Sequence, residues 1–127
     1  MFSIDIFSRT PVYEQIISQI EEYVSKGILK PGDKIPSVRA LSVKLSVNPN
    51  TIQKAFSELD AKGIIFSVPG RGCFIAEDAL ETVKSKKREK LGDLRALCEE
   101  LKTAGVTKDE IIERINLIFN NEGGDKK

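Results

Sequence analysis

The stretch SVRALSVKLSVNPNTIQKAFSELDAKG, residues 37–63, decides the fold. Ser37 is a favoured N-cap for a short helix. Apolar residues recur at helical spacing after it: Val38, Leu41 and Leu45. Asn48 is a second N-cap, and Pro49 suits the first helical position because its missing N–H would be unpaired there. This second helix is expected to end just before Gly63, and two such helices with a tight connection are typical of a helix-turn-helix.

A β-hairpin is expected directly after this pair of helices. Residues 64–68 and 73–75 are rich in residues that favour strands, and the segment between them, Pro69-Gly70-Arg71-Gly72, supplies a glycine-rich tip. A hairpin that follows a helix-turn-helix is a wing. Residues 1–76 are therefore predicted to form a winged helix-turn-helix domain.

A longer helix is expected upstream. Thr10 is a possible cap and Pro11 suits the first helical position. The apolar residues that follow have helical spacing: Val12, Ile16, Ile20, Tyr23 and Val24. Gly27 fits the left-handed position that ends a helix. Pro31-Gly32 indicates a turn, and Lys34-Ile35 has room only for a very short strand.

The composition shifts at Glu77, and residues 77–127 are predicted to form a helical tail. One charged helix is expected first, with this apolar stripe: Leu80, Val83, Leu91, Leu94, Cys98 and Leu101. After a break at residues 104–106, Thr107 and Glu110 form a capping box for a last helix. Its inward residues are Ile111, Ile112, Ile115, Ile118 and Phe119. Residues 120–127 are polar and are expected to be frayed.

The whole chain is thus predicted to be mostly α (α+β), and its composition fits a globular protein. Of its 127 residues, 40% are hydrophobic and 31% charged. The net charge of +1 carries no bulk signature of nucleic-acid binding, so a DNA-binding face must come from the placement of charge. No apolar run is long enough to cross a bilayer and no secretory signal is visible, so no membrane partner and a cytoplasmic location are expected.

Catalysis and metal binding are not expected. The chain has no histidine, and the spacing of Cys73 and Cys98 fits no zinc pattern. Two cysteines without an export signal are expected to remain reduced thiols. We therefore predict no enzyme activity, no metal and no cofactor.

The predicted helix after Asn48 has the most informative surface. At a step of about 100° per residue, four apolar residues fall on one side: Ile52, Ala55, Phe56 and Leu59. Asn50, Lys54 and Ser57 fall opposite, with Thr51 and Gln53 on the flanks. Short polar side chains let a helix enter the major groove, and amides pair bidentately with adenine. An ordinary solvated face is the alternative, and the neighbouring helix and wing favour DNA.

Three further basic features have two interpretations each. Arg39 lies in the first turn of a helix, where a cation opposes the dipole, so it is either a phosphate contact or a surface arginine. Arg71 between Gly70 and Gly72 suits the minor groove, although a turn that merely needs glycine has the same pattern. The run at residues 84–88 is either a phosphate-contacting strip or a solvated helix face, and the solvated face is favoured.

At this point the chain resembles the GntR family of bacterial regulators, and within it the short YtrA-like subfamily. The resemblance covers residues 11–76 and includes the segments Pro11–Ile16, Gly27, Leu29–Arg39, Val47–Thr51, Gly63-Ile64 and Gly70–Gly72. It implies a repressor that binds double-stranded operator DNA. The implied contacts are Ser37, Arg39, Asn48, Asn50, Thr51, Gln53, Lys54, Gly70, Arg71 and Gly72. Many relatives carry arginine where this chain has Gln53, which leaves the base preference there open.

A homodimer on a palindrome is the expected assembly. The expected dimerisation residues are Leu91, Leu94, Cys98, Leu101, Ile111, Ile112, Ile115, Ile118 and Phe119. Residues 77–127 are too few for the separate ligand-binding domain of larger family members, and whether a small-molecule effector acts here stays open. A winged helix used for protein–protein contact is the rival class, but it would favour an apolar face on the helix after Asn48.

Overall fold

The computed structural model describes the backbone of residues 2–125 and the side chains of residues 2–120. The chain forms two compact units, Met1–Lys87 and Arg88–Lys127. Four helices and three strands belong mainly to the first unit: α1 (Val12–Ser25), β1 (Lys34–Ile35), α2 (Val38–Leu45), α3 (Pro49–Ala61), β2 (Ile65–Val68), β3 (Gly72–Ile75) and α4 (Ala79–Arg88). Across residues 2–125, no helix is both long and apolar enough to span a membrane.

The helix-turn-helix is built by α2 and α3, as the sequence predicts. The Ser37 hydroxyl accepts a hydrogen bond from the Ala40 N–H at 3.0 Å and caps α2. The connection turns sharply because Ser46 adopts a left-handed conformation, with φ of 55°. Asn48 then caps α3, and Pro49 occupies its first turn. The predicted caps and the predicted order of elements are confirmed.

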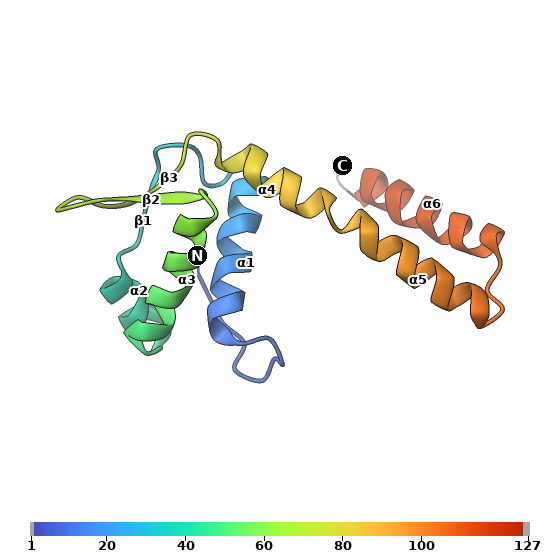
Figure 1. Ribbon diagram of the computed structural model, residues 1–127, viewed down its shortest axis with the longest axis horizontal. Coiled ribbons are helices and arrows are strands. Elements are labelled where there is room, and N and C mark those ends of the chain that lie inside the picture. The colour runs from blue at the N-terminus through green and yellow to red at the C-terminus, as the bar shows by residue number, and fades with distance from the viewer. Residues whose placement is uncertain (1, 126–127) are drawn as a thin grey trace. The chain divides into compact units, whose positions relative to one another are not determined.

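The wing is a small antiparallel sheet with strand order β1-β3-β2. β2 and β3 form the hairpin, with Phe66 opposite Phe74 and Val68 opposite Gly72. β1 adds the third strand on the other side of β3, with Lys34 opposite Phe74. Figure 1 shows the hairpin projecting from the helices of this unit on the side away from α1.

One hydrophobic core holds these elements together. Its buried members come from every element of the first unit and from the segments next to them: Phe2, Ile16, Ile17, Ile20, Val24, Leu29, Ile35, Leu41, Ile52, Ala55, Phe56, Leu59, Ile64, Ile65, Ile75, Ala79 and Val83. The four apolar residues expected on the inner side of α3 are all among them. This burial fixes which face of α3 is left to solvent.

The start of α1 differs from the expectation. Thr10 does not cap the helix; Pro11 occupies the cap position, with ψ of 149°, and its carbonyl accepts from the N–H groups of Glu14 and Gln15. The Thr10 carbonyl instead accepts from Gln15 Nε2 at 2.8 Å, and Gln15 also binds both backbone polar groups of Asp5. No described side chain therefore caps α1, and the Gln15 side chain instead ties the N-terminal segment to the helix.

The expected charged helix of the tail is divided in two. α4 ends at Arg88 and α5 (Leu91–Thr103) begins three residues later. Ala79 and Val83 on α4 are fully buried in the core of the first unit, whereas Leu80 is 37% exposed. The boundary between the compact units therefore lies after Lys87, rather than after Ala76 as the sequence suggested.

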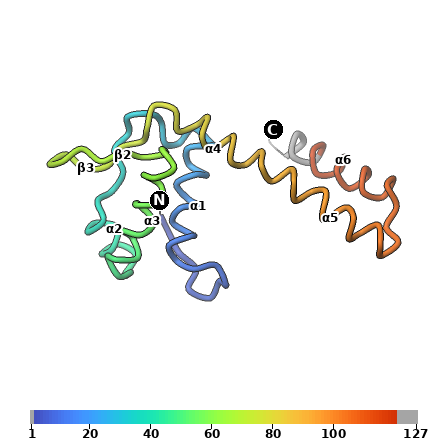
Figure 2. The backbone as a smooth tube through the Cα atoms, viewed as in Figure 1, coloured from blue at the N-terminus to red at the C-terminus, as the bar shows by residue number. Residues whose placement is uncertain are grey.

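The second unit is a helical hairpin of α5 and α6 (Lys108–Asp125), and Figure 2 shows α6 turning back alongside α5. The predicted capping box is present, since Glu110 N donates to the Thr107 hydroxyl and Thr107 N donates to Glu110 Oε1. α6 continues to Asp125, past the point at residue 120 where fraying was expected. Residues 126–127 of that expectation lie outside the described residues.

Candidate nucleic-acid interface

The outward face of α3 is polar and exposed, as the helical periodicity predicts. Asn50, Gln53, Lys54 and Ser57 are exposed, and Thr51 is half-buried. Three of these side chains, Gln53, Ser57 and Lys54, already have partners within the protein. Gln53 Nε2 donates to the Ser57 hydroxyl at 3.2 Å, and the Lys54 ammonium lies 3.9 Å from the centre of the Tyr13 ring.

The contact between Lys54 and Tyr13 joins α3 to the first turn of α1. This cation–π contact keeps the Lys54 ammonium close to α1. Tyr13 is half-buried and was given no role from the sequence, although it lies in the Pro11–Ile16 segment. Sequence analysis could not have found this pair, because it depends on how α1 packs against α3.

The start of α3 uses its own backbone and side-chain groups for capping. Asn48 Oδ1 accepts from Asn50 N at 2.8 Å, and the Asn48 carbonyl accepts from Thr51 N and Ile52 N. The amide Nδ2 of Asn48 donates to no other described residue and can still donate to a ligand. The Ser37 hydroxyl likewise accepts as the cap of α2, and its own proton can still be donated. The positions of these two residues fit a structural role at least as well as direct contact.

Arg39 and Arg71 are both exposed, and neither forms an ion pair or a side-chain hydrogen bond with another described residue. Arg39 lies in the first turn of α2. Arg71 lies at the tip of the wing, where its N–H donates to the Val68 carbonyl at 2.9 Å and closes the turn. The charges of both guanidinium groups are thus unneutralised within the described protein.

The wing tip needs its glycines. Gly70 and Gly72 have φ angles of 78° and 118°, in the region that other L-residues rarely adopt. Behind the tip, the Phe66 and Phe74 rings stack with centroids 5.8 Å apart and stiffen the outer face of the hairpin. The Lys34 side chain from β1 also lies over Gly72, a contact that the sequence did not suggest.

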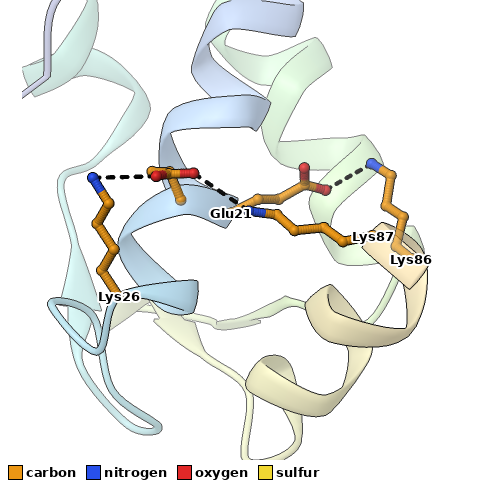
Figure 3. A network of polar contacts seen from close by, with 5 residues as sticks. Glu21, Lys26, Lys86 and Lys87 are labelled. Carbon is orange, nitrogen blue, oxygen red and sulfur yellow. Dashed lines mark hydrogen bonds and ion pairs between the residues drawn. The ribbon is translucent and has the colours of Figure 1, made fainter. Parts of the chain in front are cut away.

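The basic run at residues 84–88 is neither a free cationic strip nor simply a solvated face. Lys86 Nζ forms an ion pair of 2.7 Å with Glu21, and Lys87 Nζ lies 3.3 Å from Glu22 (Figure 3). Two lysines of the run therefore attach α4 to α1. Glu21 is a buried charged residue, only 8% exposed, so its pairing with Lys86 is structurally important.

The charges in this network shift one another. Burial opposes the charged form of Lys86, but its hydrogen bond to Glu21 raises the pKa of Lys86 above the ordinary value. The neighbouring Lys86 ammonium lowers the pKa of Lys62, and burial acts in the same direction. Hydrogen bonds from Lys26 and then Lys87 lower the pKa of Glu22. The ion pairs of Lys86 and Lys87 thus hold α4 against α1.

The expected dimerisation residues lie on the second unit and are largely uncovered. Cys98, Leu101 and Ile111 are half-buried, while the other six are exposed: Leu91, Leu94, Ile112, Ile115, Ile118 and Phe119. Residues of α5 and α6 border an apolar groove of about 440 Å³. Leu97 also lines it and is 51% exposed, a member of the stripe that the sequence analysis left out.

The candidate sites therefore divide between the two units. The first unit contains α2, α3 and the wing, with all ten residues expected to contact DNA, and the second contains all nine expected at a dimer interface. Within residues 2–120, no group of three or more metal-ligating side chains comes together.

The chain is similar to known proteins in both sequence and structure. The model of the family described as "Bacterial regulatory proteins, gntR family" matches residues 12–75. The HTH-type transcriptional repressor YtrA of Bacillus subtilis (strain 168) is 44% identical over 128 residues, covering 100% of this chain and 98% of that protein. A solved transcriptional regulator from Oenococcus oeni has a TM-score of 0.75 at 34% identity, with 91% of this chain and 97% of that chain covered. The DNA-binding domain of AraR in complex with operator ORE1 has a TM-score of 0.51 at 32% identity, with 57% of this chain and 89% of that chain covered.

Proposed function

The chain belongs to the GntR family of bacterial regulatory proteins, and from this premise we propose that it is a repressor that binds a palindromic operator as a homodimer. Like its family and its relatives, it is a DNA-binding transcription regulator and not an enzyme. In the proposal the N-terminal half of α3 enters the major groove and the wing tip enters the minor groove. The relative from Bacillus subtilis is named a repressor, which supports repression here.

The observation that carries the proposal is the exposed polar face of α3 between α2 and the wing. Asn50 and Gln53 are amides that can pair with base edges, and neither is large enough to keep the helix out of the groove. Gln53 already donates one of its two amide protons to Ser57, which ties its side chain to α3. Asn50 has no such internal side-chain contact among the described residues, so it is the stronger candidate for base readout.

The unneutralised arginines support the positions of the two neighbouring elements. Arg39 in α2 is placed to contact a phosphate beside the major groove. Arg71 at the wing tip matches the negative potential of a narrow minor groove. Lys54 and Thr51 would complete the phosphate contacts near α3, while Ser37 and Asn48 would contribute mainly by fixing the helix starts.

The dimer is supported by the apolar surface of the second unit. None of its side chains up to Asn120 is buried, and Leu91, Ile118 and Phe119 are 62%, 55% and 71% exposed. Such a surface is unusual on a monomer, and a twofold partner that offers the same surface is the commonest way to cover it. Two recognition helices related by a twofold axis would address half-sites about 34–36 Å apart, or a multiple of that.

The test is a binding titration on operator fragments selected from genomic DNA, repeated over a range of salt. Arg39→Ala and Arg71→Ala should each weaken binding and flatten the salt slope by about one unit per lost contact. Lys26→Ala is the matched control, since it removes an exposed cation at the end of α1 that pairs with Glu22. Unchanged affinity and salt slope in both arginine variants would contradict the proposal that α2 and the wing contact DNA.

Base readout by α3 has its own signature. Asn50→Ala should cost about 1–3 kcal/mol on the preferred operator and relax the preference at one base pair. Gln53→Ala should act in the same way, with a smaller loss because Gln53 starts from an internal hydrogen bond. A uniform loss over all sequences would instead assign these residues to the phosphate backbone.

A further inference from the structure

We propose that Lys34 is a phosphate contact of the wing, and that Gly72 leaves room for its side chain beside the wing tip. The inference rests on the proposed function, in which Arg71 at the wing tip enters the minor groove. It adds a second cation from a different strand, and it gives Gly72 a role besides the backbone conformation that the turn requires.

The strand register brings Lys34 to the hairpin. β1 pairs with β3 so that Lys34 lies opposite Phe74, and β3 pairs with β2 so that Val68 lies opposite Gly72. Side chains two residues apart on a strand share a face, so residues 72 and 74 share the face from which Lys34 projects. Lys34 therefore reaches diagonally from its position beside Phe74 toward Gly72 and the tip.

The contact with Gly72 is close. A Cβ built on Gly72 would lie 2.9 Å from Cε of Lys34 and 3.7 Å from its Nζ. The ammonium thus lies beside the backbone of Gly72, one residue from Arg71. By contrast, a Cβ on Gly70 would meet no atom within 4 Å, although Gly70 also has a positive φ. The two glycines share the backbone requirement, and only Gly72 makes room for a lysine.

The charge of Lys34 has no acidic partner among the described residues. Its sequence neighbour Asp33 uses its carboxylate to accept from the Lys30 N–H at 2.8 Å, which closes the turn before β1. The Lys34 ammonium, which has no counterion among the described residues, can therefore pair with an external anion. The phosphates that flank a groove provide such anions beside an inserted arginine.

The competing explanation is that only the aliphatic stem matters, as a cover for the stacked rings of the exposed Phe66 and the half-buried Phe74. Lys34→Met separates the two explanations because it keeps an apolar stem and removes the charge. Lys30→Met is the control: Lys30 is also exposed, and it lies just before β1 without contact to Gly72.

The main experiment measures operator affinity between 50 and 200 mM salt, as in the expected range for counterion release. Lys34→Met should flatten the salt slope by about 0.9 unit, which reduces the salt-induced loss of affinity over this range by roughly threefold. Lys34→Arg should retain the slope, and Lys30→Met should leave it unchanged. If Arg71→Ala flattens the slope and Lys34→Met does not, the inference is overturned. If Arg71→Ala also has no effect, the proposed wing contact itself fails.

A double-mutant cycle tests the role of Gly72. Gly72→Ala should weaken operator binding in the wild-type background and lose part of that effect in the Lys34→Met background, because the displaced ammonium is already absent. Gly70→Ala should have the same effect in both backgrounds. Additive effects of Gly72→Ala and Lys34→Met would overturn the claim for Gly72. Should Gly72→Ala prevent folding, the slope of Lys34→Met still decides whether Lys34 contacts phosphate.

Discussion

The two units of this chain have similar apolar helical patterns but opposite burial. In the first unit Ile16 and Ile20 on α1 are 1% and 0% exposed, because they belong to the core in which α1 packs against α3. In the second unit Ile115 and Ile118 on α6 are 38% and 55% exposed, although their spacing is just as regular. Helical periodicity thus identifies a face that must be covered, but it does not identify the surface that covers it.

The difference separates two physical tasks. The first unit closes its own core and can present α2, α3 and the wing as a rigid DNA-binding body. The second unit is a pair of helices whose facing residues leave an open apolar groove. A two-helix hairpin is too small to bury both stripes, so its stability should depend on a second surface. Truncations and single substitutions can test whether the first unit is stable alone and whether the second needs a partner surface.

Removal of residues 91–127 should have the largest effect. The remaining chain keeps α4 and the whole core, so it should stay folded, but it should be a monomer and bind the full operator about 10²–10⁴-fold more weakly. Sedimentation and a binding titration measure the two results. If the full-length protein is a monomer at micromolar concentration, or if the truncated chain binds equally tightly, the tail does not have the role assigned to it.

A second truncation tests whether α4 belongs to the first unit. A chain that ends at Ala76 also loses α4, and with it the fully buried Ala79 and Val83 and the ion pair between Lys86 and Glu21. It should unfold at a lower denaturant concentration than the chain that ends at residue 90. Equal midpoints would show that α4 contributes nothing to the first unit.

Truncation of one isoleucine in each unit should give unequal effects on stability. Ile20→Ala removes a fully buried side chain and should destabilise the first unit by about 2–5 kcal/mol. Ile115→Ala should leave that unfolding transition unchanged and instead weaken the association of protomers. Chemical denaturation at several protein concentrations resolves the two, because only the second effect depends on concentration. A concentration-independent loss of several kcal/mol in Ile115→Ala would mean that the second unit has a core of its own.

Local signals explain how much of the fold could be predicted. Ser37, Asn48 and Thr107 act through hydrogen bonds within three residues, so their capping roles follow from sequence alone. The start of α1 could not be predicted in the same way, since no described side chain caps it and Gln15 instead donates to the Thr10 carbonyl. The break between α4 and α5 lies at Glu89 and Lys90, two residues before Gly92, and a glycine weakens a helix. The prediction of one helix followed the apolar spacing and did not use this signal.

The same distinction between local signals and long-range contacts applies to the candidate site. The exposed face of α3 follows from its helical period, because burial of Ile52 and Leu59 determines where Asn50 lies. Contacts between distant segments carry no such period. The approach of Lys34 to Gly72 depends on strand register, and the pairs that join α1 to other helices depend on packing. Sequence analysis accordingly located the candidate DNA face but missed the side chains that support it.

The two lysines that join α4 to α1 should differ in importance. Lys86→Met leaves the buried carboxylate of Glu21 without its partner and should destabilise the first unit by about 1 kcal/mol, less than a fully buried pair because the Lys86 side chain is 39% exposed. Lys87→Met removes a surface pair and should have an effect too small to resolve. Thermal or denaturant unfolding compares them. Since the pKa of Lys86 is raised, its contribution should be complete below pH 10.5 and fade as the pH rises through the raised pKa. Equal effects of the two variants would mean that burial of Glu21 is unimportant.

The smallest expected effect is the acid titration of Glu22. Hydrogen bonds from Lys26 and then Lys87 hold the pKa of this carboxyl below its ordinary value of 4.5. The contribution of Glu22 to stability should therefore be present above pH 4.5 and disappear as the pH falls through the lowered pKa. Lys26→Met should raise the Glu22 pKa toward 4.5 by more than Lys87→Met does, since the Lys26 bond has the larger influence. Carboxyl NMR titration of the wild type and both variants measures the shift directly. An ordinary Glu22 pKa in the wild type would mean that Lys87 does not bind α1, and that α4 is attached by Lys86 and its two buried apolar residues alone.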